Sequence, residues 1–181
     1  MKKLFLSLTV LLSTLGVWAQ TKIDDVALLS NGKAYSVSTK RGGWAVTEDG
    51  SRFKSTNDLG KGLTANYGDI QQAFSFKTID SKTYLYSIYA EKYVNSDASL
   101  SETHQNDITF IPQGDGTFVI KFDNAHYINI GGSNQMIIDG WSEADYGNKV
   151  TITDITETAK CNDNKCDCTV QSTCFRIDRC K

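Results

Sequence analysis

Short runs of apolar and β-branched residues, separated by polar turns, dominate the chain between residues 30 and 156. Apolar and polar positions alternate most clearly in residues 74–76, 118–122 and 150–153, which is typical of half-buried strands. No segment of helical length shows an apolar period that fits a helix. The pattern predicts an all-β chain with strands at residues 35–37, 44–46, 73–79, 84–89, 108–111, 118–122, 127–130, 136–138 and 150–155.

An internal repeat organises these strands. An aromatic residue that opens one strand is followed nine residues later by an aromatic residue that opens the next strand. This spacing occurs three times, in the pairs Tyr35 and Trp44, Tyr84 and Tyr93, and Phe118 and Tyr127. Each copy then crosses a polar loop and closes with an apolar strand, and the copies start 49 and 34 residues apart. Three such units predict a closed threefold β structure, because closure removes exposed strand edges.

This layout resembles the β-trefoil and, within it, the ricin B-type lectin-like modules of secreted Bacteroidota-type proteins. The resemblance covers about residues 24–157 and is carried by residues 31–35, 72–76, 84–94 and 141–148. It implies an all-β, β-trefoil domain over residues 20–158. Ricin-type repeats close with Q-x-W, and Gln72-Ala73-Phe74 approaches that motif with Phe for Trp, whereas the other copies carry Asn106 and Asn148 in the Gln position. The expected fold does not depend on this motif. Because two copies lack it, the resemblance does not imply sugar binding in every repeat.

The resemblance also places a candidate ligand site in the third copy. Ricin-type repeats carry a polar residue after the second strand opens, an aromatic residue on the following loop, and an Asn before the closing strand. An aromatic face can stack on a pyranose, and amides or carboxylates can bind its hydroxyls. The corresponding residues are Asn129, Trp141 and Asn148, with Asp139 and Asp145 as carboxylate acceptors. A purely structural role for Trp141 and Asn129, as loop cover and turn cap, stays open.

A secondary ligand site is expected in the second copy. Its residues are Asn95, His104 and Asn106. In the first copy Ala45 fills the polar position, so no site is expected there. Neighbouring tyrosines such as Tyr84 and Tyr86 share a strand face and are more typical of core than of a platform. Arg41 lies in the first hairpin turn, where a solvated turn residue is favoured over a functional arginine.

Residues 1–19 have the layout of a secretory signal peptide. Lys2 and Lys3 precede an apolar run over residues 4–17, and Val17 and Ala19 occupy the −3 and −1 positions of a cleavage site. The run is shorter than the ~20 residues needed to cross a bilayer, and no lipobox cysteine follows it. We predict cleavage after Ala19, a secreted, periplasmic or cell-surface location, and no membrane span in the mature chain.

All five cysteines lie in the C-terminal tail, residues 159–181. Their spacing matches neither a pair of zinc knuckles nor a redox C-x-x-C motif. An exported chain favours disulfides, and two pairs leave one thiol that could link to a partner. A thiolate metal cluster and a disordered tail are the alternatives. The disulfide candidates are Cys161, Cys166, Cys168, Cys174 and Cys180.

Charge and missing motifs narrow the function. The 181 residues are 40% hydrophobic with a net charge of −2, which suits one domain with a core and disfavours a nucleic-acid binder. The chain holds two histidines, His104 and His126, and no nucleophile elbow, P-loop or H-E-x-x-H motif. Loop acids such as Glu143 are usually solvated, which disfavours a glycosidase. We predict a non-enzymatic module, without cofactor or metal, that binds a glycan or glycoprotein mainly through the third copy.

Two other functions remain open. The first is a protein-binding trefoil, such as a secreted protease inhibitor, that uses the insertion over residues 55–69 with Leu59, Leu63 and Tyr67. The second is a scaffold whose cysteine tail mediates disulfide or metal linkage. For a single shallow glycan site we expect weak affinity, about millimolar to tens of micromolar.

Overall fold

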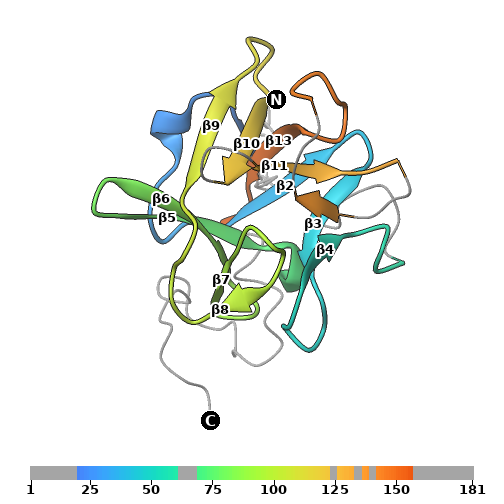
Figure 1. Cartoon of the computed structure of the whole chain (residues 1–181). Coiled ribbons are helices and arrows are strands. Elements are labelled where there is room, and N and C mark those ends of the chain that lie inside the picture. Colours follow the sequence, from blue (N-terminus) through green and yellow to red (C-terminus); the bar gives the residue numbers. More distant parts are fainter. Residues whose placement is uncertain (1–19, 61–68, 123–125, 133–135, 139–141, 157–181) are drawn as a thin grey trace, which may run out of the picture.

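The computed structural model describes residues 20–60, 69–122, 126–132, 136–138 and 142–156 (Figure 1). Antiparallel β-structure dominates these residues, which confirms the expected all-β class. Two short 3-10 turns, η1 (Val26–Leu28) and η2 (Ile70–Gln72), lie between strands. The strands are β1 (Thr21–Ile23), β2 (Tyr35–Thr39), β3 (Gly42–Val46), β4 (Phe53–Ser55), β5 (Phe74–Ile79), β6 (Lys82–Ser87), β7 (Lys92–Val94), β8 (Leu100–Ser101), β9 (Ile108–Pro112), β10 (Phe118–Phe122), β11 (His126–Ile130), β12 (Met136–Ile138) and β13 (Lys149–Asp154).

Six of these strands form a closed ring. Along the ring, β2 pairs with β5, β5 with β6, β6 with β9, β9 with β10 and β10 with β13. The pairing of β13 with β2, from Thr151 opposite Ser38 to Asp154 opposite Tyr35, closes it. The short strand β1 continues the line of β10 along β13. A closed ring leaves no long exposed edge among its members, which protects the sheet from edge pairing.

The ring is built from three successive four-strand units. Each unit leaves the ring through a pair of strands outside it and then returns: β3 and β4 follow β2, β7 and β8 follow β6, and β11 and β12 follow β10. The closing strands of the units are β5, β9 and β13. The threefold organisation expected from the aromatic spacing is therefore present in the strand pairing.

The strand pairing shows which residues of the three units are equivalent, and this alignment is shifted by one residue, in part of the chain, from the one that the aromatic spacing suggests. The opening and closing strands of each unit meet where Tyr35 faces Phe74, Thr83 faces Ile108 and Phe118 faces Val150. At the first turn, Ser38 faces Gly43, Tyr86 faces Tyr93 and Lys121 faces Tyr127. Trp44 thus corresponds to Val94 and Ile128, and not to the two tyrosines. The turns differ in length, so equal spacing in the sequence does not mark equivalent positions.

A single aromatic cluster fills the interior between the units. Trp44 is fully buried and meets Phe53 and Phe74 edge to face, with ring centroids 5.4 and 6.1 Å apart. Such T-shaped contacts add stability beyond the burial of apolar area. The same core cluster includes buried residues from every opening strand, among them Val37, Leu85 and Ile120. Alternation along the strands therefore turns every unit toward one shared core.

The predicted strands all occur, with ends shifted by a few residues. Sequence patterning missed the shortest strands, β1, β4 and β8, which have two or three residues each. No helix in the described part of the chain is long and apolar enough to cross a membrane. The leader, residues 1–19, and the cysteine tail from residue 159 onward lie outside the described residues.

Candidate functional site

A polar site joins the first unit to the third. The turn between β2 and β3 is braced locally, because the Arg41 backbone N–H donates to Thr39 Oγ1 (2.9 Å) and Asn57 Nδ2 donates to the Arg41 carbonyl (2.8 Å). The Arg41 guanidinium then donates through Nη1 to Asp145 Oδ1 (2.6 Å) and to the Ile130 carbonyl (3.1 Å). Arg41 is therefore not a solvated turn residue, as the sequence suggested, but a bridge between distant segments.

Asp145 organises the segment that precedes β13. Its Oδ1 accepts the Gly147 N–H (2.7 Å) as well as Arg41. Two tight turns shape the segment, because the Asp145 N–H donates to the Ser142 carbonyl (3.0 Å) and the Asn148 N–H to the Asp145 carbonyl (3.1 Å). The Asp145 side chain keeps 15% of its surface exposed and that of Arg41 keeps 30%. The pair therefore presents one acceptor and one donor at the edge of this segment.

Gly147 allows this segment to approach β11 closely. The Ile130 N–H donates to the Gly147 carbonyl (3.1 Å). A Cβ atom at position 147 would come within 3.0 Å of the Ile130 carbonyl and of Asn129 Oδ1, closer than real Cβ atoms lie. A glycine is required here for space, and the backbone of β11 depends on it.

Asn129 and Asn148, predicted to bind ligand, are both fully buried. Asn148 Nδ2 donates to the Ser142 carbonyl (2.5 Å), but the described residues offer no hydrogen-bond partner to its Oδ1. Within the same part of the chain, both polar atoms of the Asn129 amide are also buried without a partner. A buried amide without partners costs stability, so these groups are expected to hold ordered water. Their burial corrects the expectation of surface ligands: a ligand outside the segment does not reach them.

Tyr146, beside Asp145, is the aromatic ring that this segment presents to solvent. Its exposed fraction of 58% exceeds that of any other large apolar side chain in the described residues. The Lys40 ammonium lies 4.8 Å from the centroid of its ring. Sequence reasoning missed Tyr146, because it assigned the aromatic residue that stacks on a sugar to Trp141, five residues earlier. The available signal was its position, one residue after a predicted acceptor and one before a glycine.

A second tyrosine lies nearby on β11. The Tyr127 hydroxyl donates to Glu143 Oε1 (2.9 Å), and this hydrogen bond raises the pKa of Tyr127. The Lys121 ammonium lies 5.0 Å from the centroid of the Tyr127 ring. The two remaining predicted ligands of this copy, Asp139 and Trp141, lie outside the described residues.

The secondary site predicted in the second copy combines a buried, a half-buried and an exposed residue, namely Asn95, Asn106 and His104. Asn95 is buried, and its amide is satisfied: Nδ2 donates to Ser99 Oγ (3.0 Å) and Oδ1 accepts from Ser101 Oγ (3.1 Å). Asn106 Oδ1 accepts the Ser96 N–H (3.0 Å), so Asn106 anchors the loop that leads into β9. These two asparagines therefore hold the unit together.

His104 belongs instead to a surface cluster of aromatic rings. Its exposed ring lies over Tyr84 (centroids 4.5 Å apart) and against Tyr93 (5.6 Å). The Lys77 ammonium covers the Tyr86 ring at 3.1 Å from the centroid. Burial lowers the pKa of Lys77 and raises that of Tyr86. Because Lys77 covers Tyr86 and His104 covers Tyr84, this cluster offers less free stacking surface than Tyr146.

Comparison of equivalent positions separates the third unit from the others. The register aligns Ala45, Asn95 and Asn129, and it confirms that Ala45 fills the polar position of the first unit. The serines that satisfy Asn95 have no counterpart at Ile137, which faces Asn129 where Ser99 would lie. Of these three equivalent positions, the one in the third unit therefore holds a buried amide without a hydrogen-bond partner among the described residues.

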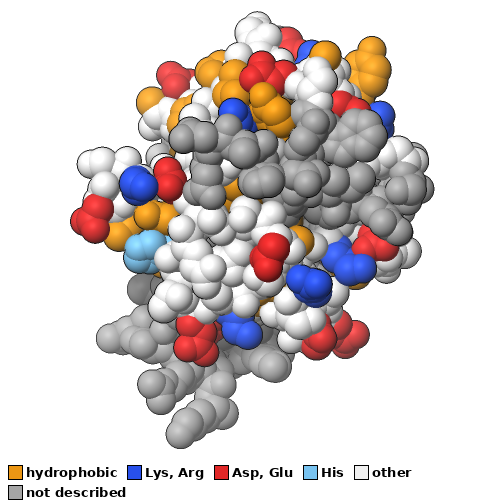
Figure 2. Space-filling model, in the orientation of Figure 1, with side chains coloured by type: hydrophobic (Ala, Val, Ile, Leu, Met, Phe, Trp, Pro, Cys, Tyr) orange, Lys and Arg blue, Asp and Glu red, His pale blue; other side chains and the backbone are white. Residues whose placement is uncertain are grey.

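The space-filling view shows how charges are distributed over one face of the described residues (Figure 2). Acidic and basic side chains are interspersed on the face in Figure 2. Among the described residues, no group of three or more His, Cys, Asp or Glu is arranged to hold a metal ion. The five cysteines and residues 61–68, which make up most of the insertion considered for protein binding, lie outside the described part.

Comparisons with known proteins bear on the fold. No protein-family model matches the chain, and no curated protein matches it. Among solved structures, it is similar to the GlcNAcα1-4Gal-releasing endo-β-galactosidase from Clostridium perfringens, with a TM-score of 0.56 and 10% identity. The likeness covers 67% of this chain and 32% of that enzyme, so the chain spans about a third of the enzyme's length. At this identity the likeness shows a shared fold.

Proposed function

We propose that the chain is an exported, non-enzymatic β-trefoil module of the ricin B-type lectin-like kind, which binds a glycan through its third unit. The observation that carries the proposal is the exposed Tyr146 ring beside the Arg41–Asp145 pair. The closed six-strand ring with three protruding strand pairs supports the trefoil assignment.

The site has the groups that a pyranose requires. Tyr146 offers a ring face for the apolar side of the sugar. Asp145 can accept hydrogen bonds from sugar hydroxyls, and Arg41 and Lys40 can donate to them. Such a site is shallow, so its affinity is about millimolar to tens of micromolar unless several sites act together.

The structural neighbour supports the choice of first ligands. That enzyme is described as releasing GlcNAcα1-4Gal, so its substrate contains this disaccharide. Glycans that end in GlcNAcα1-4Gal are accordingly the first candidates for this chain.

Binding without catalysis is the simplest use of the acids at this site. Asp145 is ion-paired with Arg41, and Glu143 accepts the Tyr127 hydroxyl. Neither Asp145 nor Glu143 is therefore available as the unpaired general acid or base that glycoside hydrolysis needs. Incubation with a GlcNAcα1-4Gal-terminated glycan should release no sugar, and release would contradict this part of the proposal.

Export is part of the proposal and fits the start of the fold. Strand β1 begins at Thr21, two residues after Ala19, so cleavage there would leave β1 intact. The mass of the protein recovered outside the cytoplasm would show the expected new terminus at Gln20. A retained leader would contradict the export proposal.

A glycan array with three matched proteins tests the binding function. Wild type should bind a subset of glycans, Tyr146→Ala should lose that binding, and Leu28→Ala should keep it. Leu28 is a suitable control because its 52% exposure is close to that of Tyr146 and it lies in η1. Trp141→Ala, added as a fourth protein, tests the aromatic role predicted from sequence. A blank array for folded wild type would contradict the proposal and favour a protein partner.

A further inference from the structure

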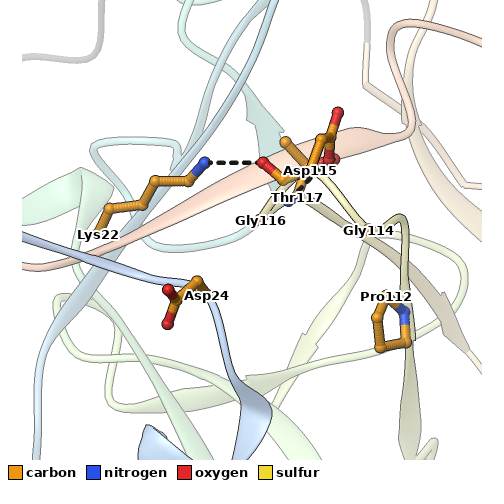
Figure 3. A pocket seen from close by; sticks show the side chains of 7 residues that line it. All are labelled: Lys22, Asp24, Pro112, Gly114, Asp115, Gly116 and Thr117. Atoms are coloured by element: carbon orange, nitrogen blue, oxygen red, sulfur yellow. Dashed lines mark hydrogen bonds between the residues drawn. The ribbon is translucent and has the colours of Figure 1, made fainter.

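A cavity of about 460 Å³ lies where the N-terminal strand passes the turn between β9 and β10 (Figure 3). Its lining comes from two segments: Lys22 and Asp24 at one side, and the turn at the other. The turn contributes Pro112, Gly114, Asp115, Gly116 and Thr117. The volume lies within the range of about 300–1,000 Å³ that small-molecule sites occupy.

The turn is held by its own hydrogen bonds. The Gln113 N–H donates to the Thr117 carbonyl (3.0 Å), and Asp115 Oδ1 accepts the Thr117 N–H (3.0 Å) and hydroxyl. These hydrogen bonds lower the pKa of Asp115, so its carboxylate is ionised and committed to the turn. The wall of the cavity is therefore set before any ligand arrives.

Lys22 and Asp24 bring opposite charges to the cavity. Lys22 Nζ donates to the Asp115 carbonyl (3.4 Å) across the space, as Figure 3 shows. The described residues provide no hydrogen bond or ion pair to the Asp24 carboxylate. Two carboxylates repel an anion, and an ammonium group repels a cation. A neutral ligand with several hydroxyls suits both, since each hydroxyl can donate to Asp24 or accept from Lys22.

The absent side chain at Gly116 keeps this space open. A Cβ atom there would lie 3.0 Å from Lys22 Nζ and 3.5 Å from Asp24 Cβ. A methyl group at this position would therefore enter the gap between the two charged side chains. Gly114, in the same turn, has no atom within 4 Å of its corresponding position.

We propose that this cavity is a second binding site, for a neutral polyhydroxylated ligand the size of one sugar residue. The site shares no residue with the Tyr146 site. Strands β2 and β10 point in the same direction, because each is antiparallel to β13. The β2–β3 turn follows the end of β2, whereas the β9–β10 turn precedes the start of β10. The two sites therefore lie at opposite ends of the ring, and one chain could engage two sugar residues at once.

Amide NMR spectra of the full chain, titrated with methyl β-galactoside and with N-acetylglucosamine, test this site. We expect at least one sugar to shift the resonances of Lys22, Asp24 and the 114–117 turn. Gly116→Ala should weaken this binding about tenfold by blocking the space, and Asp24→Asn about tenfold by removing a charged acceptor. Gly32→Ala is the matched control, because Gly32 and Gly116 both have positive φ (+83° and +74°) and share the backbone strain of substitution, whereas Gly32 does not line the cavity.

The outcomes separate this site from the Tyr146 site. If both sugars leave these resonances unmoved, or if Gly32→Ala weakens binding as much as Gly116→Ala, the second site is refuted. Unchanged binding in Asp24→Asn refutes it as well, and that variant does not depend on turn strain. Tyr146→Ala should leave these shifts unaltered, so failure at either site is visible independently of the other.

Discussion

Gly147→Ala tests how tightly the segment before β13 packs on β11. The added Cβ would lie within 3.0 Å of the Ile130 carbonyl oxygen and carbon and of Asn129 Oδ1, two of which are backbone atoms that cannot swing away. Relief requires the two segments to separate, which weakens the Ile130–Gly147 and Gly147–Asp145 hydrogen bonds. Overpacking costs about 1–3 kcal/mol, and each hydrogen bond about 1 kcal/mol. We expect the free energy of unfolding to fall by about 3 kcal/mol.

Urea unfolding followed by the fluorescence of buried Trp44 measures this loss. With a slope of about 2 kcal/mol per molar urea, the midpoint should fall by about 1.5 M. Gly132→Ala is the matched control, since its corresponding position has no atom within 4 Å, and its midpoint should stay near that of wild type. Equal midpoints for Gly147→Ala and wild type would refute the close packing described here.

Three further predictions concern the core and the ion pairs. Trp44→Ala should lower the free energy of unfolding by about 3–5 kcal/mol in urea, because the ring is fully buried among aromatic neighbours. Asp154 accepts a hydrogen bond from Lys33 (2.8 Å). Burial raises the pKa of Asp154, but its hydrogen bonds, of which the one from Lys33 is the largest, outweigh burial, so the pKa of Asp154 lies below its ordinary value of 3.8. The stability that the ionised Asp154 carboxylate contributes is fully present above the pKa of the unfolded chain and is lost as the pH falls through the lowered pKa of the folded chain. The melting temperatures of wild type and Asp154→Asn should therefore converge as the pH falls from about 5 to about 2. A double-mutant cycle with Arg41→Ala and Asp145→Ala should give a coupling of about 1 kcal/mol, and a coupling near zero would show that the pair does not join the units.

Much of the fold could be predicted because period-two alternation reports which strand face is buried. The strands of the ring are five or six residues long and carry this signal clearly. Strand β8, with two residues, is too short to show any period. The register between units was less accessible. The register depends on turn lengths, which differ between the units and make Trp44 equivalent to Val94 and Ile128.

The candidate site was harder to predict than the fold. Asn129 and Asn148 carry polar amide side chains, which are usually exposed, and only packing shows that both are buried. Arg41 contacts Asp145, a residue 104 positions away, which no local pattern can reveal. The exposure of Tyr146 could not be predicted from a local pattern either, because it depends on how the segment folds. The assignment of a ligand site to the third unit stays a prediction.

The most direct test of the central claim is an amide NMR map of the full chain with the strongest ligand found on the glycan array. The account predicts that the largest shifts fall on Tyr146, Gly147 and Asp145, together with the Lys40–Arg41 turn that contacts them. This location would come from wild-type protein, without relying on any substitution. Large shifts confined to other parts of the chain, with this site unmoved, would contradict the assignment of glycan binding to the third unit.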